Sequence, residues 1–275
     1  VLTHAFGGSA GREGAALQLG GSLGGTIGKW LKLDEYDQKV MIMCGMSAAF
    51  SALFGTPLTA TIFAMEVVSI GIMEYAALVP CAIASLIARE MANMVGAHAE
   101  QFPVPASVTL DIKSGALIVL LALLCAAVSI LFCEVLHRTE RLFKFRMKNP
   151  WVRVVVGALL VIVLAKVLGT TDYLGAGMNI VERAIHGETE PAAFLLKIIF
   201  TAITLSCGFK GGEIVPTLFV GATFGCLFGQ VTGLSPSLTA ACGMAAVFCG
   251  VTNSPISSLL LSFELFGFDC MPFFL

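Results

Sequence analysis

The chain has 275 residues, of which 57% are hydrophobic and only 12% are charged, and its mean hydropathy is +0.91. Soluble domains rarely reach such values, so the composition excludes an ordinary soluble protein and predicts an integral membrane protein. The net charge of −2 provides no broad basic surface, and we therefore expect no nucleic-acid partner.

Apolar runs, prolines and glycines predict a series of helices. In chain order, we expect helices at residues 12–31, 40–54, 58–69, 73–94, 115–145, 151–168 and 194–207. Polar or acidic loops are expected at residues 32–39, 98–113 and 169–190. Residues 214–263 then carry no charge. Because one span needs about 20 residues, this run must hold several helices, divided by Pro216, Pro236 and Pro255. The predicted fold is all-α and polytopic, with broken transmembrane helices.

A basic connection sets the expected orientation in the membrane. Residues 138–153 hold six Lys and Arg residues, whereas the loops around Glu100 and at 182–190 are neutral or acidic. By the positive-inside rule the basic connection faces the cytoplasm, so we expect a multi-pass protein of the cell membrane, embedded in the lipid bilayer. Because the chain starts without methionine and ends on an apolar tail, we also expect a fragment of a longer protein.

The chain repeats itself with an offset close to 200 residues. An offset of 198 relates Pro57 to Pro255 and Glu66 to Glu264, and an offset of 201 relates Gly20 to Gly221. Glu13 and Glu213 are 200 residues apart. We predict that residues 1–97 are the C-terminal part of a first membrane repeat. Residues 98–113 would be the connection, and 114–275 a second repeat lacking its last helices. The pattern alone leaves the relative direction of the repeats open. Duplicated halves of this kind build a transport site at their interface.

The first approach loop has the composition of an anion site. Gly11 and Gly14 expose the backbone amides of a first helical turn, and the positive end of the helix dipole lies there. Glu13 stands inside this turn, so its carboxylate can occupy the anion site or leave it when protonated. A simple dipole-stabilising acid is the alternative, which the intramembrane position disfavours.

These segments carry a resemblance to a known family. Residues 11–14 (Gly-Arg-Glu-Gly) and residues 211–222 (Gly-Gly-Glu-Ile-Val-Pro-Thr-Leu-Phe-Val-Gly-Ala) resemble the CLC chloride channel and transporter family. Residues 55–66 and 253–264 resemble the two paired short helices of that family. The resemblance implies antiparallel, inverted repeats of tilted helices, a homodimer with one pore per subunit, and halide sites at helix N-termini.

The resemblance also assigns roles to residues. Glu13 matches the gating glutamate, and the backbone of Gly11, Arg12 and Gly14 matches one side of the anion site. Ile214 and Val215 match the pair whose amides face the central ion. The implied function is transport of chloride or fluoride ions, and no cofactor is implied.

Two departures from the family pattern indicate which branch of the family the chain resembles. Val67 stands where proton-coupled chloride exchangers carry an inner glutamate, and Glu213 stands where an apolar residue is more common. Both features resemble the fluoride/proton antiporters, although that branch commonly has Thr at the position of Val215. We interpret Glu213 as a candidate proton-coupling residue whose pKa would rise on desolvation; a gate, or a solvated residue beside Lys210, is the alternative. A passive chloride channel is the second functional hypothesis.

The remaining acidic and histidine residues have less specific roles. We expect Glu66 and Glu264 to be helix caps or interface partners. His4, His98, His137 and His186 are isolated in the sequence, so no metal site is expected. A membrane-embedded enzyme would need paired intramembrane acids, a Ser-His arrangement or His-Glu-x-x-His, and the sequence has none of them. An inactive fragment is the third hypothesis.

Overall fold

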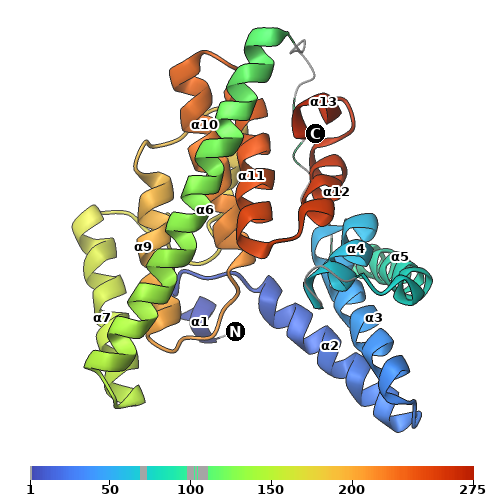
Figure 1. Cartoon of the computed structure of the whole chain (residues 1–275). Helices are drawn as coiled ribbons and strands as arrows, with labels where there is room; N and C mark the ends of the chain where they lie inside the picture. Colours follow the sequence, from blue (N-terminus) through green and yellow to red (C-terminus); the bar gives the residue numbers. More distant parts are fainter. Residues whose placement is uncertain (1, 69–72, 98–101, 103, 105–110) are drawn as a thin grey trace. The chain divides into compact units, whose positions relative to one another are not determined.

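The computed structural model describes residues 2–68, 73–97, 102, 104 and 111–275, and within them the regular structure is helical. The helices of the N-terminal part are α1 (Leu2–Ala5), α2 (Glu13–Trp30), α3 (Glu35–Phe54), α4 (Pro57–Val68), η1 (Tyr75–Ala77) and α5 (Leu78–Met94). They are followed by α6 (Ile112–Arg146), α7 (Pro150–Leu168), α8 (Met178–Ile185), α9 (Ala193–Ser206), α10 (Ile214–Thr232), α11 (Pro236–Thr252), α12 (Pro255–Phe266) and α13 (Met271–Phe274) (Figure 1).

The chain divides into two compact units that cut across the sequence repeat. The first unit contains residues 1–12 and 104–251, and the second contains residues 13–103 and 252–275. Each unit therefore includes segments from both halves of the repeat. The predicted connection at 98–113 lies largely outside the described residues, and the predicted boundaries of the repeats stay a prediction.

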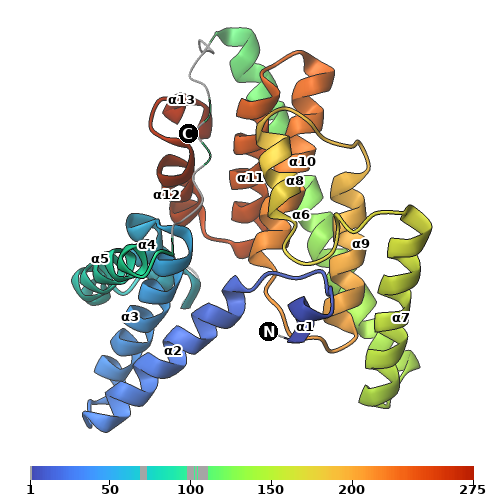
Figure 2. The same cartoon turned by 180° about the vertical axis from the view of Figure 1, so that it is seen from behind.

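The first unit is built around α9 and α10. The 35-residue helix α6 packs beside α9, which also contacts α7 and α10 (Figures 1 and 2). A capping box starts α6, because the Asp111 carboxylate accepts from the Ser114 amide at 2.8 Å. Most of α10 is buried, whereas α7 exposes much of its apolar surface, as a lipid-facing helix does.

Four helical segments in the described residues are long and apolar enough to cross a membrane: Tyr75–Met94, α6, α7 and α10. The shorter apolar helices are α4, α9, α11 and α12. The fifty-residue uncharged run is thus divided into three helices, each with a proline in its first turn, as the sequence predicts.

Glycines bring helix backbones together in the same way in both units. In the second unit, a Cβ on Gly20 would lie 2.2 Å from the Gly45 carbonyl oxygen of α3. In the first unit, a Cβ on Gly221 would lie 2.4 Å from the Gly243 carbonyl oxygen of α11. Gly20 and Gly221 are equivalent in the repeat, so both positions exclude a side chain for the same reason.

Within the second unit, α4 and α12 cap each other reciprocally. The Glu264 carboxylate accepts from the amides of Leu58 and Thr59 at 3.0 and 2.8 Å and from Thr59 Oγ1 at 2.7 Å. The Glu66 carboxylate accepts from the equivalent groups, the amides of Ile256 and Ser257 at 3.2 and 2.9 Å and the Ser257 hydroxyl.

This arrangement confirms that both glutamates are caps. Each carboxylate near the C-terminal end of one helix holds orphan donors at the N-terminus of the other. The two helices therefore run antiparallel, which is the relation expected of inverted repeats.

Removing one of these caps should destabilise the protein. We expect Glu264→Gln to lower the free energy of unfolding by about 1–3 kcal/mol, because the amide loses the charge and leaves a donor at the N-terminus of α4. The melting temperature of the full-length protein in detergent measures this effect. Glu90→Gln, at an exposed acid of α5, is the matched control. Equal melting temperatures for the two variants would contradict the cap.

Two predicted loops contain helix that the sequence reading missed. The prediction of a loop at residues 32–39 is wrong beyond residue 34, because Asp34 accepts from the Asp37 amide at 2.8 Å and α3 starts at Glu35. The loop predicted at residues 169–190 contains α8, which buries Ile180, Val181, Ala184 and Ile185. Eight residues are too few for a reliable helical period.

Candidate functional site

The two glycine motifs meet within the first unit. Gly11 and Gly212 form an isolated antiparallel bridge, with N···O distances of 2.8 Å from Gly11 to Gly212 and 2.7 Å in return. The two residues are 201 residues apart, close to the offset of the repeat, so corresponding approach loops pair with each other in antiparallel directions. Ala10 packs against Gly211 beside this bridge, so closely that a Cβ on Gly211 would lie 2.3 Å from the Ala10 Cβ.

Further contacts fix the N-terminal segment to α9 and to the second motif loop. Ser9 is wholly buried, its amide donates to Thr204 Oγ1 at 3.2 Å, and its hydroxyl lies 3.1 Å from that of Thr201. The Thr3 hydroxyl donates to the Lys210 carbonyl at 2.7 Å. The loop that carries Gly11 and Arg12 is therefore held in place in the first unit.

The N-terminus of α10 offers backbone donors. Glu213 is the N-cap residue and makes no side-chain capping hydrogen bond, and Pro216 in the same turn has no N–H. Ile214 and Val215 are buried at 9% and 1% exposure. Their amides belong to the first turn, where no intrahelical acceptor exists. A buried helix N-terminus of this kind can bind a small anion through its amides and its dipole.

Glu13 opens α2 in the second unit, followed by Gly14. The Glu13 side chain is buried, with 6% exposure, although it is ionisable. Acids are seldom buried without a specific role, so its burial makes Glu13 a candidate functional residue. The side chain of Arg12 is exposed, and the role expected of this residue rests on its backbone.

Glu213 lines a cavity of about 240 Å³ in the first unit. The cavity lies between α6, the end of α9 and the loop before α10. Its walls are Cys133, Leu136, His137, Glu140, Leu205, Ser206, Phe209, Lys210, Gly211 and Glu213. His137 and Glu140 are close enough to act electrostatically on Glu213. His137 looks isolated in the sequence, although it shares one face of α6 with Cys133 and Glu140.

A buried lysine outside the predicted site residues holds the connection between α7 and α8 in place. Lys197 of α9 is fully buried, and its Nζ donates to the carbonyls of Gly175 and Tyr173 at 2.8 and 3.3 Å. The same Nζ lies 4.9 Å from the ring centroid of Phe219 on α10. A single lysine within an apolar helix is the sequence signal that could have identified it.

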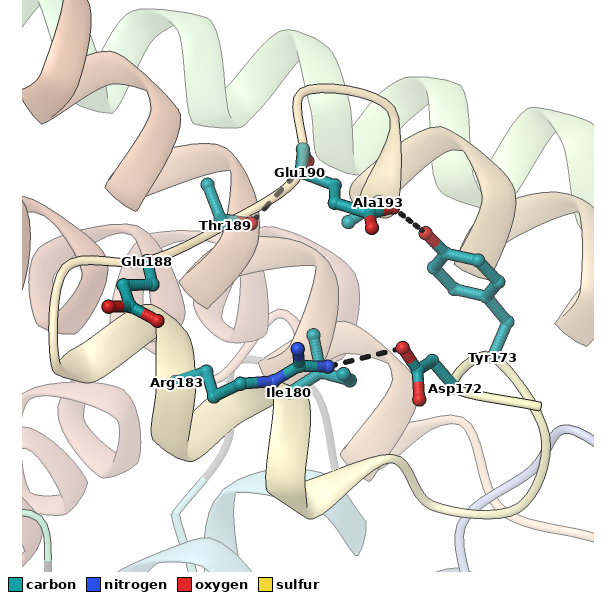
Figure 3. A pocket seen from close by; sticks show the side chains of 8 residues that line it. All are labelled: Asp172, Tyr173, Ile180, Arg183, Glu188, Thr189, Glu190 and Ala193. Atoms are coloured by element: carbon teal, nitrogen blue, oxygen red, sulfur yellow. Dashed lines mark hydrogen bonds and ion pairs between the residues drawn. The ribbon is translucent and has the colours of Figure 1, made fainter. Parts of the chain in front are cut away.

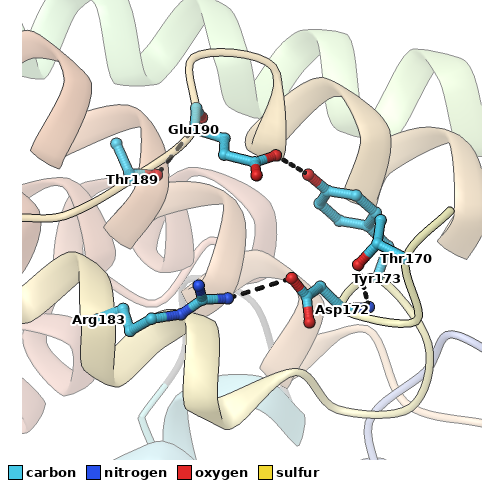
Figure 4. Close-up of polar contacts among 6 residues, drawn as sticks. All are labelled: Thr170, Asp172, Tyr173, Arg183, Thr189 and Glu190. Atoms are coloured by element: carbon cyan, nitrogen blue, oxygen red, sulfur yellow. Dashed lines mark hydrogen bonds and ion pairs between the residues drawn. The ribbon is translucent and has the colours of Figure 1, made fainter. Parts of the chain in front are cut away.

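A second cavity of about 240 Å³ lies beside this connection (Figure 3). Asp172 and Arg183 point toward each other across it and form an ion pair at 3.2 Å. The Tyr173 hydroxyl donates to Glu190 at 2.9 Å, and the Thr170 hydroxyl accepts from the Asp172 amide at 3.1 Å (Figure 4). Burial and the Glu190 contact raise the pKa of Tyr173 to about 12, so its phenol stays a donor at neutral pH. These paired groups attach the connection to α8 and to the start of α9.

The whole chain, residues 1–275, matches the family described as voltage gated chloride channel. The chain belongs to this family. The resemblance drawn from the two glycine motifs is thereby confirmed, and the voltage gated chloride channel fold accounts for the multi-pass, all-α architecture.

Two comparisons identify similar proteins. The chain is 32% identical, over 278 residues, to a chloride/fluoride channel protein of Pseudomonas syringae pv. tomato; the match covers 99% of this chain and 62% of that protein. It is 36% identical, with a TM-score of 0.95, to the crystal structure of a CLC-type fluoride/proton antiporter, covering 99% of this chain and 69% of the other. The chain thus spans a little over three fifths of the length of the Pseudomonas protein.

A third comparison concerns the fold alone. A slow cyanobacterial Cl−/H+ antiporter superposes with a TM-score of 0.84 at 19% identity, covering 99% of this chain and 67% of the other. The fold of the described residues is thus shared across members whose sequences have diverged widely.

Proposed function

We propose that the protein transports small inorganic anions and exchanges fluoride for protons. The observation that carries this proposal is the pairing of Gly11 with Gly212, which joins the two approach loops next to the uncapped N-terminus of α10. Backbone amides with a partial positive charge attract a small anion without trapping it as a full cation would. On this proposal the protein acts as a transporter and not as an enzyme.

The proposal assigns a role to each residue of the two motifs. The amides of Ile214 and Val215, with the backbone of Gly11, Arg12 and Gly14, would bind the anion. Glu13 would gate the pathway by competing with the permeant anion. Glu213 would take up the proton that is exchanged for fluoride.

The surroundings of Val67 support Glu213 as the proton acceptor. Val67 leaves no acid at the inner position on α4, and the neighbouring Glu66 is already engaged by the Ile256 and Ser257 amides. A carboxylate that holds orphan donors of a helix is a poor proton carrier, because protonation would cost it those bonds. Glu213 makes no capping bond and lines a cavity.

The relatives support the same reading. One is named a chloride/fluoride channel protein and another is described as a fluoride/proton antiporter. The proposal includes a homodimer that is embedded in the lipid bilayer of the cell membrane. A passive chloride channel remains the competing function, since Val67 also removes the proton route of chloride exchangers.

Ion-selective electrodes test this proposal. Vesicles containing the full-length protein and loaded with either fluoride or chloride are diluted into anion-free buffer, and external pH is recorded together with anion release. We expect fast fluoride release with matching proton uptake, and much slower chloride release. Chloride release without pH change would indicate the passive channel. Release equal to that of empty vesicles for both anions would exclude transport.

A further inference from the structure

The cavity beside Glu213 contains titratable groups that the proposed function does not yet use. The groups that face Glu213 are Cys133, His137 and Glu140 of α6 and Lys210 of its own loop; Arg153 of α7 acts on Glu140. Among them, the imidazole of His137 is the side-chain type that most often transfers protons in proteins, because each of its two ring nitrogens can carry a proton. The cavity has room for several water molecules.

The hydrogen bond of His137 settles which of its nitrogens can exchange protons. The His137 Nδ1 lies 2.7 Å from the Cys133 carbonyl oxygen, one turn earlier on α6. A carbonyl only accepts, so Nδ1 carries a proton and donates it. In the neutral ring, Nε2 is then the acceptor that can bind a proton.

Glu140 lies on the same face of α6 as His137, three residues further along. Its carboxylate pairs with Lys144 Nζ at 2.6 Å and is half exposed. This end of α6 leads into the basic connection that the positive-inside rule assigns to the cytoplasm. A carboxylate at the mouth of the cavity attracts protons from solvent toward the cavity.

We infer that this cavity is the proton access route of the transporter, with His137 as the group that exchanges protons with Glu213 and Glu140 as a positioning residue at its mouth. The inference rests on the proposed exchange of fluoride for protons. A hydrated proton forms an N–H bond at His137 Nε2. That bond breaks as an O–H bond forms on the Glu213 carboxylate, directly or through cavity water. His137 and Glu213 are then both neutral, so one positive charge has moved from solvent at the mouth of the cavity to Glu213.

Rates of fluoride and proton exchange across pH test this route. His137→Ala, in the full-length protein, should slow exchange at least about tenfold near pH 8, where hydronium is scarce, and approach the wild-type rate near pH 5. Glu140→Gln should slow it less, with the same pH trend. His186→Ala and Glu134→Gln are matched controls: His186 is exposed outside the cavity, and Glu134 forms a similar pair on α6 with Arg138.

Chemical rescue separates a proton carrier from a merely structural residue. Imidazole at equal concentration on both sides of the membrane should restore the rate of His137→Ala, while 1,2,4-triazole, which stays unprotonated, should not. If His137→Ala does not fold, His137→Asn, which can keep a donor toward the Cys133 carbonyl, is measured instead.

The possible outcomes distinguish this inference from the proposed function. A slowed and rescued variant supports the route. Two results would overturn the route while leaving the proposed function intact. One is a His137→Ala variant that keeps the wild-type pH profile. The other is a variant that folds and is slowed but is not rescued by imidazole. Wild-type protein without fluoride/proton exchange would overturn the proposed function itself.

Discussion

Replacing Glu213 with glutamine is expected to abolish proton uptake during fluoride release. Glutamine preserves the shape and polarity of the side chain but carries no exchangeable acid, and positioned proton-transfer groups contribute about 10²–10⁴-fold to such steps. Glu213 is well placed for this role, because it lines a cavity and makes no capping hydrogen bond to α10. We therefore expect proton uptake at least about 100-fold below wild type.

The control for this variant is Glu182→Gln, at an exposed acid of α8 in the same unit. This variant also removes one negative charge, but at a position outside the cavity. It should leave fluoride release and proton uptake unchanged. Normal proton uptake in Glu213→Gln would assign the coupling to another residue. The same external pH electrode records both variants in vesicles loaded with fluoride.

Replacing Glu13 with glutamine is expected to remove most of the pH dependence of anion release. In the wild type, the rate should rise as the pH falls, by up to about tenfold per pH unit, because each protonated carboxylate stops competing with the anion. Glutamine imitates the protonated side chain at every pH, so the variant should stay near the fast, low-pH rate. The burial of Glu13 makes this side chain a strong candidate for the competitor.

A matched acid is available for comparison with Glu13. Glu35 is the first residue of α3 as Glu13 is of α2, but Glu35 is exposed. Glu35→Gln should keep the pH profile of the wild type. If Glu13→Gln also keeps that profile, the gate lies elsewhere in the protein.

The repeat explains why much of the fold could be predicted from the sequence. Glycines, prolines and glutamates recur at nearly constant offsets because equivalent backbones must approach closely, turn and be capped in both halves. The bridge of Gly11 with Gly212 and the caps made by Glu66 and Glu264 satisfy that expectation in two separate places. In each place equivalent segments run antiparallel, a direction that offsets along the sequence could not supply.

The parts that could not be predicted depend on contacts between distant segments. The segments that carry Lys197 and Tyr173 show only an apolar helix and an acidic loop in the sequence, and their hydrogen bond exists because the loop folds back onto α9. His137 looked isolated for the same reason, since its neighbour Glu213 is 76 residues away in the chain. Short-range spacing identified the motif loops but not the cavity that joins one of them to α6.

The central claim, that fluoride movement is coupled to protons, is tested most directly by uphill transport. Vesicles containing the full-length protein are prepared with equal fluoride on both sides, and a proton gradient is imposed with the membrane potential held at zero. We predict that fluoride moves against its own developing gradient, in the direction opposite to protons, and that dissipating the proton gradient stops it. Fluoride that stays at equilibrium under the imposed gradient, in vesicles that release fluoride downhill, would contradict the account.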